Sequence, residues 1–348
     1  MPVPMNAICK TEPSVGLALC EVPEPVPRYG EVLVRVSRTS LCGTDLHIYQ
    51  WDSWAQSRLK PPLIIGHEFC GHVVAVGEGV ESLQVGDFVA GESHIVCGQC
   101  KPCREGQAHV CLNTRILGVD TDGCFAPLIT LPAQNAQRTD PRIPPEVATV
   151  QDPLGNAVHT VLSGEVAGRS VLVTGCGAIG LFSIAVARAC GAERIFSTEV
   201  RSYRRELALR MGADCVWDPT CEDVTHALMK ATNGVGVDVG LEMSGHPSAI
   251  ELLTRAIRPG GRISLLGLFA GPALVDLNTL IFKSVTIHAI LGRRLYQTWE
   301  TMQSLLLSGK LDVRPIITHE LAWHEYERAF ELLASGTAGK VILNWEDA

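Results

Sequence analysis

The chain has 348 residues, of which 46% are hydrophobic and 19% are charged, and its formal net charge is −8 at pH 7. This length is too great for one ordinary hydrophobic core and predicts two domains. The acidic balance and the lack of a basic run argue against a nucleic-acid partner. No apolar stretch approaches the roughly eighteen residues of a membrane-spanning helix, so we expect no membrane partner.

The cysteine usage and the N-terminal sequence indicate the cellular compartment in which the protein folds. The first residues contain no uninterrupted apolar segment of the kind that signal peptides carry. The chain has thirteen cysteines, an odd number, and apart from one cluster they are scattered. This usage is typical of a reduced, intracellular protein rather than of a secreted disulfide framework. We therefore expect a cytoplasmic protein.

The first part of the chain is predicted to be rich in β-structure. Alternating or β-branched runs occur at residues 31–36, 72–76 and 87–90, separated by glycine, proline and polar residues. The frequent glycines fit a small, strongly curved sheet or barrel. We assign residues 1–151 to this domain.

The pattern then changes to strands that alternate with helices. Apolar strands at residues 171–175 and 194–199 flank a helical stretch at residues 178–191, and the alternation continues beyond them. Such spacing predicts a parallel, doubly wound sheet, so the fold class is α/β. We assign residues 152–294 to this domain and expect residues 295–348 to return to the first one.

Four cysteines occur at the spacing C-x2-C-x2-C-x7-C. They are Cys97, Cys100, Cys103 and Cys111, in a lobe at residues 94–112 that has too few apolar residues for a core of its own. Four thiolates suit a tetrahedral structural Zn²⁺, whose binding would stabilise the folded lobe. Disulfides are an alternative. An iron–sulfur cluster is another, although its fourth cysteine usually follows after three residues and precedes proline.

A glycine-rich loop follows the first strand of the second domain. Gly175, Gly177 and Gly180 form G-x-G-x-x-G, which allows a tight turn and close approach of a pyrophosphate to a helix N-terminus. Glu199 ends the next strand, where an acid binds ribose hydroxyls and would repel a 2′-phosphate, which favours NAD over NADP. Nearby arginines, including Arg204, weaken that preference. The other expected cofactor contacts are Ile179, Leu266 and Gly267.

A second set of metal-binding residue types is spread along the chain. Cys42 stands beside a glycine, His67-Glu68 follows an apolar stretch that contains proline, and Asp152 lies at the predicted domain junction. Three protein ligands and one open position define a catalytic zinc site. Each residue alone has an ordinary explanation, such as a buried cysteine or a turn residue. Together they suggest a catalytic metal.

These features occur in one order along essentially the whole chain, and in this the sequence resembles the zinc-dependent medium-chain alcohol dehydrogenases. Within that superfamily it is most similar to the L-threonine 3-dehydrogenases. The closer similarity lies in four stretches, which are CGTDLHIYQWDSWAQ at residues 42–56, GHEF at 66–69, DPLGNAVHT at 152–160 and GLEMSG at 240–245.

The resemblance implies a GroES-like catalytic domain, a Rossmann domain that binds NAD, and two Zn²⁺ ions per chain, one catalytic and one structural. It assigns Thr44 and His47 to a proton relay through the cofactor ribose. Homotetramers are common in the family, so we expect one here. The residues implied to hold or adjust the catalytic zinc are Cys42, His67, Glu68 and Asp152.

The resemblance also implies a reaction in threonine catabolism. The 3-hydroxyl of L-threonine would be oxidised to give L-2-amino-3-oxobutanoate, with hydride transfer to NAD⁺. Candidate contacts for the carboxylate are His94 and Arg294. The ammonium group could lie against Trp51 or Trp54, or near Glu68 or Asp152. Trp51 and Trp54 packing in a subunit interface is the structural alternative. Two other functions stay open: another zinc-dependent alcohol or polyol dehydrogenase, of the 2,3-butanediol or sorbitol type, and a non-catalytic protein that binds NAD and zinc.

Overall fold

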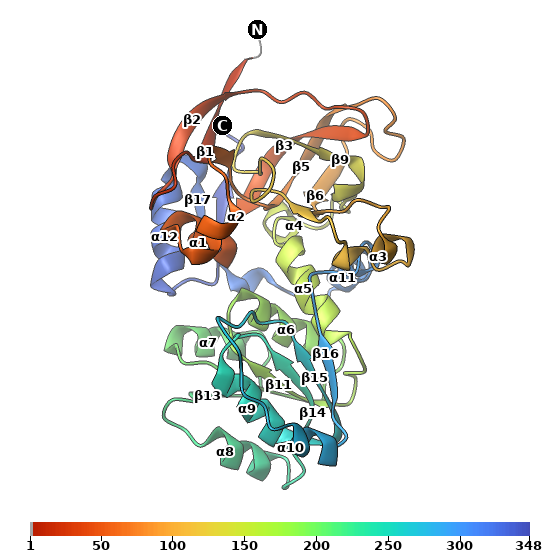
Figure 1. The fold of residues 1–348 in the computed structure, drawn as a ribbon, viewed down its shortest axis with the longest axis vertical. Helices are drawn as coiled ribbons and strands as arrows, with labels where there is room; N and C mark the ends of the chain where they lie inside the picture. The colour runs from red at the N-terminus through yellow and green to blue at the C-terminus, as the bar shows by residue number, and fades with distance from the viewer. Residues whose placement is uncertain (1–2) are drawn as a thin grey trace. The chain divides into compact units, whose positions relative to one another are not determined.

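The computed structural model describes residues 3–348, which form two compact units. The first contains the chain up to Asp152 together with Ile317–Ala348, and the second contains Pro153–Ile316. In Figure 1 the first unit has the red, orange and yellow segments together with the dark blue C-terminal segment, and the second runs from yellow-green through cyan to light blue.

The first unit is built around a seven-stranded sheet. The central strand β3 (Glu31–Ser40) is antiparallel to its neighbours and buries Val32, Val34 and Val36 on one face. Strand β3 pairs with the last strand of the chain, so residues 340–344 lie beside residues from the first quarter of the sequence. The sheet runs in the order β10 (Ala136–Arg138), β6 (Phe88–Gly91), β5 (Glu68–Val76), β3, β18 (Lys340–Asn344) and β17 (Ile317–Ala322), and β9 (Leu128–Pro132) also pairs with β3.

Two smaller sheets and several short helices complete this unit. One sheet has the order β2 (Ala18–Pro23), β1 (Pro4–Lys10) and β4 (Leu63–Ile64), and the other pairs β7 (His94–Ile95) with β8 (Arg115–Ile116). The helices are α1 (Gly43–Gln50), α2 (Ser53–Arg58), α3 (Lys101–Arg104), α4 (Pro145–Ala148) and α12 (Tyr326–Ser335), with 3₁₀ turns at Ala108–Val110, Ala133–Asn135 and Trp323–Glu325.

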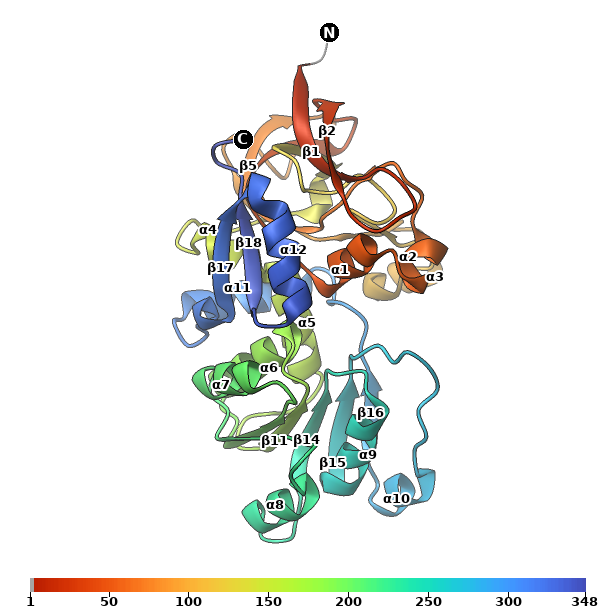
Figure 2. The same ribbon diagram turned by 90° about the vertical axis from the view of Figure 1, so that its left-hand side faces the viewer.

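The second unit contains a sheet of six parallel strands with crossover helices (Figure 2). Its strand order is β13 (Cys215–Trp217), β12 (Arg194–Thr198), β11 (Ser170–Thr174), β14 (Val237–Glu242), β15 (Ile257–Leu265) and β16 (Thr286–Ala289). The helices are α5 (Gln151–Val161), α6 (Ala178–Ala189), α7 (Ser202–Arg210), α8 (Val224–Ala231), α9 (Pro247–Ala256), α10 (Leu277–Phe282) and α11 (Gln297–Leu307), with a 3₁₀ turn at Arg314–Ile316. The predicted α/β class with a doubly wound parallel sheet is confirmed.

The return to the first unit begins at Ile317, whereas the sequence placed it at residue 295. Helix α11 buries Trp299 and Met302, and the turn at Arg314–Ile316 packs against α6 and α7. Both elements lie within Pro153–Ile316, so α11 belongs to the second unit. The order of elements along the chain could not reveal this packing. None of the helices in residues 3–348 has the length and apolar character needed to cross a membrane.

Candidate active site

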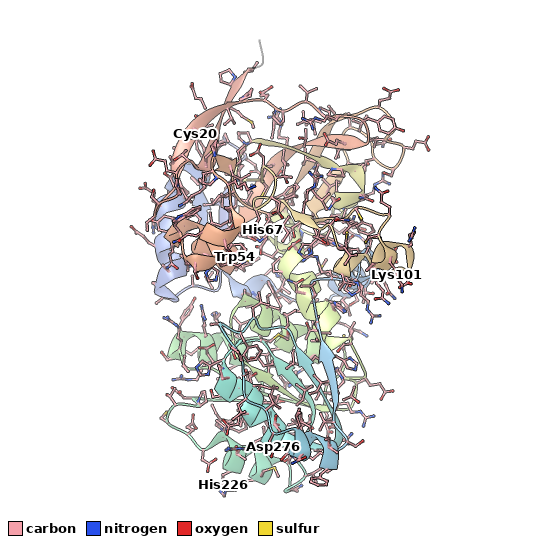
Figure 3. All side chains as sticks on the ribbon, in the orientation of Figure 1. Cys20, Trp54, His67, Lys101, His226 and Asp276 are labelled. Atoms are coloured by element: carbon pink, nitrogen blue, oxygen red, sulfur yellow. The ribbon has the colours of Figure 1, made fainter. Side chains whose placement is uncertain are left out.

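The four-cysteine lobe lies between β7 and β8, and Lys101 marks it in Figure 3. The Sγ atom of Cys111 lies 3.5 Å from that of Cys97 and 3.8 Å from that of Cys100. A disulfide requires about 2.05 Å between two sulfur atoms. All thirteen cysteines are free, so the lobe contains thiols rather than disulfides.

Hydrogen bonds to sulfur prepare this lobe for a cation. The backbone N–H groups of Cys97 and Asn113 both approach Cys111 Sγ at 3.3 Å. Donation from the backbone of Gln99, followed by the Asn113 side chain, lowers the pKa of the Cys97 thiol to about 6. The thiolate is the form that binds metal. The sulfur atoms of all four cysteines lie within 4.8 Å of one another, which fits a closed tetrahedral zinc site.

The second group of metal-binding side chains combines Cys42, His67 and Glu68, whose ligand atoms also lie within 4.8 Å of one another. Cys42 is the N-cap of α1 in extended conformation, where the positive end of the helix dipole favours an anionic ligand. His67 (labelled in Figure 3) and Glu68 directly follow Gly66. Gly66 has a φ of +90°, and a Cβ there would lie 2.1 Å from the Phe125 ring. Only glycine therefore lets the chain place these two ligands here.

Asp45 stands behind this group. It is fully buried, and its Oδ2 accepts a hydrogen bond of 2.8 Å from the backbone N–H of Cys42. Its Oδ1 lies 3.5 Å from Nδ1 of His67. Histidine ligands commonly turn their second ring nitrogen toward such a carboxylate. This arrangement leaves the other ring nitrogen of His67 for an ion.

The charges around His67 also favour a cation. Burial by itself would lower the pKa of His67, but the negative charges of Asp45 and Cys42 outweigh burial and raise it well above its usual value. Among the described residues, Oδ1 of Asp45 and Nδ1 of His67 are buried without a conventional hydrogen-bond partner. The site thus demands positive charge, and its mixed sulfur, nitrogen and oxygen donors suit zinc.

Glu68 is held by the C-terminal strand. Its Oε2 accepts hydrogen bonds from Lys340 Nζ and Ser40 Oγ, and Lys340 also donates to the carbonyl of Leu41 at 2.8 Å. Lys340 is only 2% exposed. Burial lowers its pKa, but the charge of Glu68 opposes burial and the net effect raises it, so Lys340 is a cation. One carboxylate oxygen of Glu68 is thereby engaged, and the other remains to bind a metal.

The predicted relay residues lie on α1, directly after Cys42. Thr44 is partly buried and His47, one helical turn later, is exposed. Nδ1 of His47 is 2.5 Å from Oδ2 of Asp52, and the Trp54 ring lies 6.1 Å from the imidazole. Asp52 also caps α2 by accepting the Ala55 N–H, which fixes its position. The acid partner of His47 was not predicted from the sequence.

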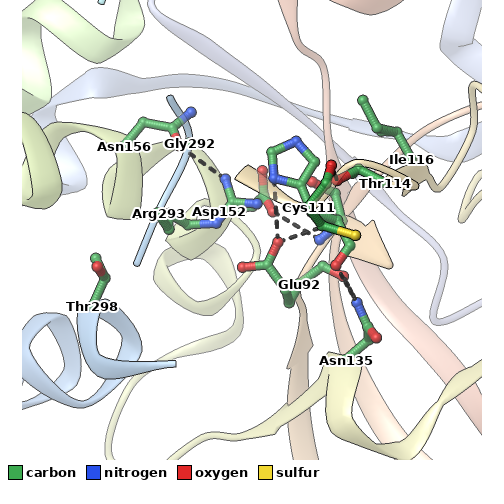
Figure 4. A network of polar contacts seen from close by, with 12 residues as sticks. Glu92, Cys111, Thr114, Ile116, Asn135, Asp152, Asn156, Gly292, Arg293 and Thr298 are labelled. Carbon is green, nitrogen blue, oxygen red and sulfur yellow. Dashed lines mark hydrogen bonds and ion pairs between the residues drawn. The ribbon is translucent and has the colours of Figure 1, made fainter. Parts of the chain in front are cut away.

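Asp152 and His94, predicted as a metal residue and a substrate contact, lie in other hydrogen-bond networks. Asp152 is not part of the Cys42 group, and its Oδ1 accepts the Ser93 N–H at 3.1 Å. The buried Glu92 accepts the His94 N–H at 2.9 Å and lies 3.8 Å from its imidazole. The side chain of Asn135 donates to the carbonyls of Glu92 and His94 (Figure 4). The segment that carries His94 is therefore held on several sides.

The two other predicted substrate contacts differ in their surroundings. Lys10 Nζ lies 5.0 Å from the centre of the Trp51 ring, so one face of this indole already contacts a cation. Arg294 is exposed and its backbone N–H donates to Thr298 Oγ1 at 3.0 Å. Both roles stay predictions.

The glycine-rich loop joins β11 to α6, as expected for a dinucleotide site. Gly175 has a φ of +87°, and Gly177 is the N-cap of α6. A Cβ on Gly180 would lie 2.0 Å from the Gly175 carbonyl oxygen, so the loop can close only with glycine there. Ile179 lies in the first turn of α6. The free N–H groups at this helix start can bind a pyrophosphate.

Glu199 follows β12 and contacts the same loop. Its Oε2 accepts the backbone N–H of Cys176 at 2.8 Å, and its Oε1 accepts that of Arg201 at 2.9 Å. Arg204 is partly exposed on α7. Glu199 is thus oriented at the carboxyl ends of the parallel strands, where such sheets bind nucleotides.

Leu266 and Gly267 lie at the same edge of the sheet. Their backbone N–H groups donate to the Glu242 carbonyl at 3.0 and 3.1 Å. A Cβ on Gly267 would lie 2.4 Å from Glu242 Oε2, and this carboxylate also accepts the N–H groups of Ser244 and Gly245. The buried Glu242 therefore organises two loops at once.

Sequence reasoning missed several residues that shape these sites. Asp45 and Glu242 lie inside stretches that carry the family resemblance, and an acid three residues after an N-cap is a recognisable capping signal. Lys340 and Ser40 had no such signal, because neither stands near Glu68 in sequence. The missed residues are Ser40, Asp45, Asp52, Glu92, Glu242 and Lys340.

Two family models match the chain. The alcohol dehydrogenase GroES-like domain matches residues 28–141, and the zinc-binding dehydrogenase domain matches residues 178–308. An L-threonine 3-dehydrogenase from Pyrococcus abyssi is 55% identical over 340 residues, which cover 97% of this chain and 98% of the relative. The chain belongs to the zinc-dependent medium-chain alcohol dehydrogenase family.

Solved structures of this family have the same fold. The alcohol dehydrogenase TADH from Thermus sp. ATN1 has a TM-score of 0.91 at 32% identity, covering 98% of this chain and 99% of the other. An alcohol dehydrogenase from Escherichia coli CFT073, solved in complex with NADH, has a TM-score of 0.90 at 28% identity with the same coverage. The family membership and the two groups of metal-binding side chains together show that the cofactors are NAD and two zinc ions per chain.

The two metal groups should lose zinc independently. We expect two zinc ions per chain in the protein as purified, with one lost in Cys42→Ser and a different one lost in Cys103→Ser. Cys221→Ser is the matched control, because this exposed cysteine lies outside both groups. Mass spectrometry of bound zinc measures the stoichiometry. Retention of both ions in the double variant Cys42→Ser/Cys103→Ser would contradict the assignment.

Lys340→Met should destabilise the first unit by about 3 kcal/mol, because it leaves the buried Glu68 carboxylate without its cation. Urea unfolding of the zinc-loaded protein, followed by circular dichroism, measures the change. Arg142→Gln removes an exposed ion pair with Asp140 and should leave the unfolding midpoint nearly unchanged. Equal changes in the free energy of unfolding for the two substitutions would show that the buried ion pair contributes no more to stability than the exposed one.

Proposed function

We propose that this protein oxidises the 3-hydroxyl of L-threonine with NAD⁺, yielding L-2-amino-3-oxobutanoate, NADH and a proton. The observation that carries the proposal is the full-length similarity to the Pyrococcus enzyme. The grouping of Cys42, His67 and Glu68 supports it. An alcohol or polyol dehydrogenase has less support, because the solved alcohol dehydrogenases are less similar to this chain. A role without catalysis would not require an open set of three ligands.

Cys42, His67 and Glu68 would hold the catalytic zinc, and Asp152 would coordinate or adjust it. When bound there, zinc supplies a Lewis acid that lowers the pKa of the substrate hydroxyl. Lys340 and Ser40 hold one oxygen of Glu68, and Asp45 faces His67. These partners preorganise the ligands, which reduces the rearrangement needed when an ion and a substrate bind.

Thr44 and His47 would carry the released proton toward solvent. They lie three residues apart on α1 and so share one helix face. The carboxylate of Asp52 accepts a hydrogen bond from Nδ1 of His47, which assigns the hydrogen to Nδ1 and leaves Nε2 as the proton acceptor. An imidazole suits this step because one ring nitrogen can accept a proton while the other donates one.

The dinucleotide would bind along the glycine-rich loop, with Glu199 at the adenosine ribose. NAD⁺ supplies the hydride acceptor. The Glu199 carboxylate is oriented by two backbone N–H groups, and its charge would repel the additional phosphate of NADP. Arg204 would then contact the dinucleotide from α7, and Leu266 and Gly267 would contact it at the end of β15.

For the substrate, we propose that His94 and Arg294 bind the carboxylate. His94 is supported by the buried Glu92 and by Asn135, which hold its backbone. The ammonium group would lie against an indole, either Trp51 or Trp54. Trp54 stands beside His47, whereas one face of Trp51 is already in contact with Lys10.

We also propose a homotetramer in the cytoplasm. Strand β16 forms one edge of the six-stranded sheet, and an edge strand offers unpaired backbone groups to another chain. The nearby Leu277, Ile281 and Phe282 expose large apolar surfaces, which mark protein interfaces. The thirteen free cysteines agree with a reducing compartment.

A substrate panel tests the reaction. The zinc-loaded protein with NAD⁺ should oxidise L-threonine with a kcat/KM at least about 10²-fold above that for 2,3-butanediol or sorbitol, since a site for two charged groups discriminates against substrates that lack them. Absorbance of NADH gives the rates. Cys42→Ser is the control for the metal site and should be inactive. Activity confined to the polyols would overturn the proposal.

Light scattering tests the assembly. We expect a mass of four times the 37.5 kDa chain. Phe282→Asp should lower this mass, because it places a charge in the apolar patch beside β16. Val26→Asp, at an equally exposed apolar position in the first unit, is the matched control and should not. A monomeric wild-type protein would contradict the tetramer.

A further inference from the structure

The stretch DPLGNAVHT carries much of the family resemblance, yet only Asp152 enters the proposed chemistry. Its later residues lie on α5 in the second unit. His159 lies three residues after Asn156 and four after Gly155 on this helix, so it shares one side of the helix with both. All three contact the segment at residues 292–293, more than 130 residues later in the chain.

Two hydrogen bonds join α5 to this segment. Nδ1 of His159 lies 2.9 Å from the carbonyl oxygen of Gly292. A carbonyl only accepts hydrogen bonds, so Nδ1 carries the hydrogen. Asn156 Oδ1 accepts a bond of 3.0 Å from Arg293 Nη1, and Figure 4 shows these two side chains facing each other. His159 is 7% exposed and Arg293 is 1% exposed, so both bonds are shielded from water.

Gly155 makes the close approach possible. A Cβ at this position would lie 2.4 Å from Cδ and 2.7 Å from Cγ of Arg293. The stem of Arg293 therefore occupies the space that a side chain on residue 155 would need. Thr298 holds the segment from its other end, since its hydroxyl accepts the Arg294 N–H and its own N–H donates to the Arg294 carbonyl, both at 3.0 Å.

The held segment lies where a dinucleotide would bind. It follows β16, whose Ala289 is paired with Leu265 of β15, and the Ile290 N–H donates to the Leu265 carbonyl at 2.9 Å. It therefore lies at the carboxyl edge of the parallel strands, next to Leu266 and Gly267. With the adenosine half directed toward Glu199 after β12, the nicotinamide half must extend in the opposite direction, over the ends of β14, β15 and β16.

We propose that Gly155, Asn156 and His159 are positioning residues that hold the backbone of residues 292–294 ready for the nicotinamide half of the cofactor. This inference rests on the proposed NAD-dependent function. Without the two hydrogen bonds the segment gains conformational freedom, and cofactor binding must then order it at an entropic cost. We expect the effect to be confined to the nicotinamide half, because the glycine-rich loop follows β11 and Glu199 follows β12, whereas the held segment follows β16 at the far edge of the sheet.

Two pairs of variants test the proposal on the zinc-loaded protein. His159→Leu and Asn156→Leu remove the donor and the acceptor, while His159→Gln and Asn156→Asp retain them. The Kd for NADH, measured by calorimetry, should rise about tenfold in each Leu variant, equivalent to about 1.4 kcal/mol. The Kd for NADH of His159→Gln and of Asn156→Asp should stay within about threefold of the wild-type value, because these variants keep the donor or the acceptor. If one Leu variant fails to fold, the Leu variant at the other position and its conservative partner still test the proposal.

ADP-ribose separates a positioning role from a general structural one. This ligand lacks nicotinamide and should bind the wild type and all four variants with the same affinity. His226→Leu, at an exposed histidine on α8, is the matched control and should bind NADH as the wild type does. NADH binding unchanged in both Leu variants, or an equal loss of ADP-ribose binding, would overturn the positioning role. A wild-type protein that binds NADH but does not oxidise threonine would overturn only the proposed substrate.

Discussion

The buried ion pair between Lys340 and Glu68 is the constraint on which the first unit depends. Its partners are 272 residues apart and both are nearly inaccessible to water. A charge buried without a partner costs several kcal/mol, so neither side chain can be buried alone. Strand β18 must pair with β3 in the register that sets Ile342 opposite Ser40, which brings Lys340 to Glu68. The pairing that docks the C-terminal strand therefore also fixes the position of the metal ligand Glu68.

Buried carboxylates organise the rest of both sites without touching a reacting group. Asp45, Glu92 and Glu242 are all fully buried. Each accepts backbone N–H groups of a neighbouring turn, which belong to Cys42, to His94 and to Ser244 and Gly245. Charge-assisted bonds of this kind are roughly twice as strong as neutral ones. They fix loop conformations that would otherwise be too irregular to hold a ligand or a cofactor.

The two metal groups differ in how their geometry arises. The lobe draws four thiols from one short loop, and backbone N–H groups of that loop donate to the sulfur of Cys111. The group of Cys42, His67 and Glu68 draws its three donors from two distant stretches, the start of α1 and the start of β5, and its supporting partners come from β3, α1 and β18. A closed set of four ligands suits a structural role, whereas a set of three leaves room for a substrate.

The grouping of Cys42 with His67-Glu68 came from the family resemblance. The sequence by itself determined whatever depends on local backbone geometry: the α/β class, the cysteine lobe and the glycine-rich loop. Their spacing is visible in the chain because neighbouring residues impose it. The resemblance also implied that Asp152 coordinates or adjusts the metal; in the structure its Oδ1 accepts the Ser93 backbone N–H, and its role at the metal stays a prediction.

Only the tertiary structure decided the contacts between distant residues, such as Lys340 with Glu68 and His159 with Gly292, and the assignment of α11 to the second unit. These depend on strand register and core packing, which bring together residues that no local pattern relates.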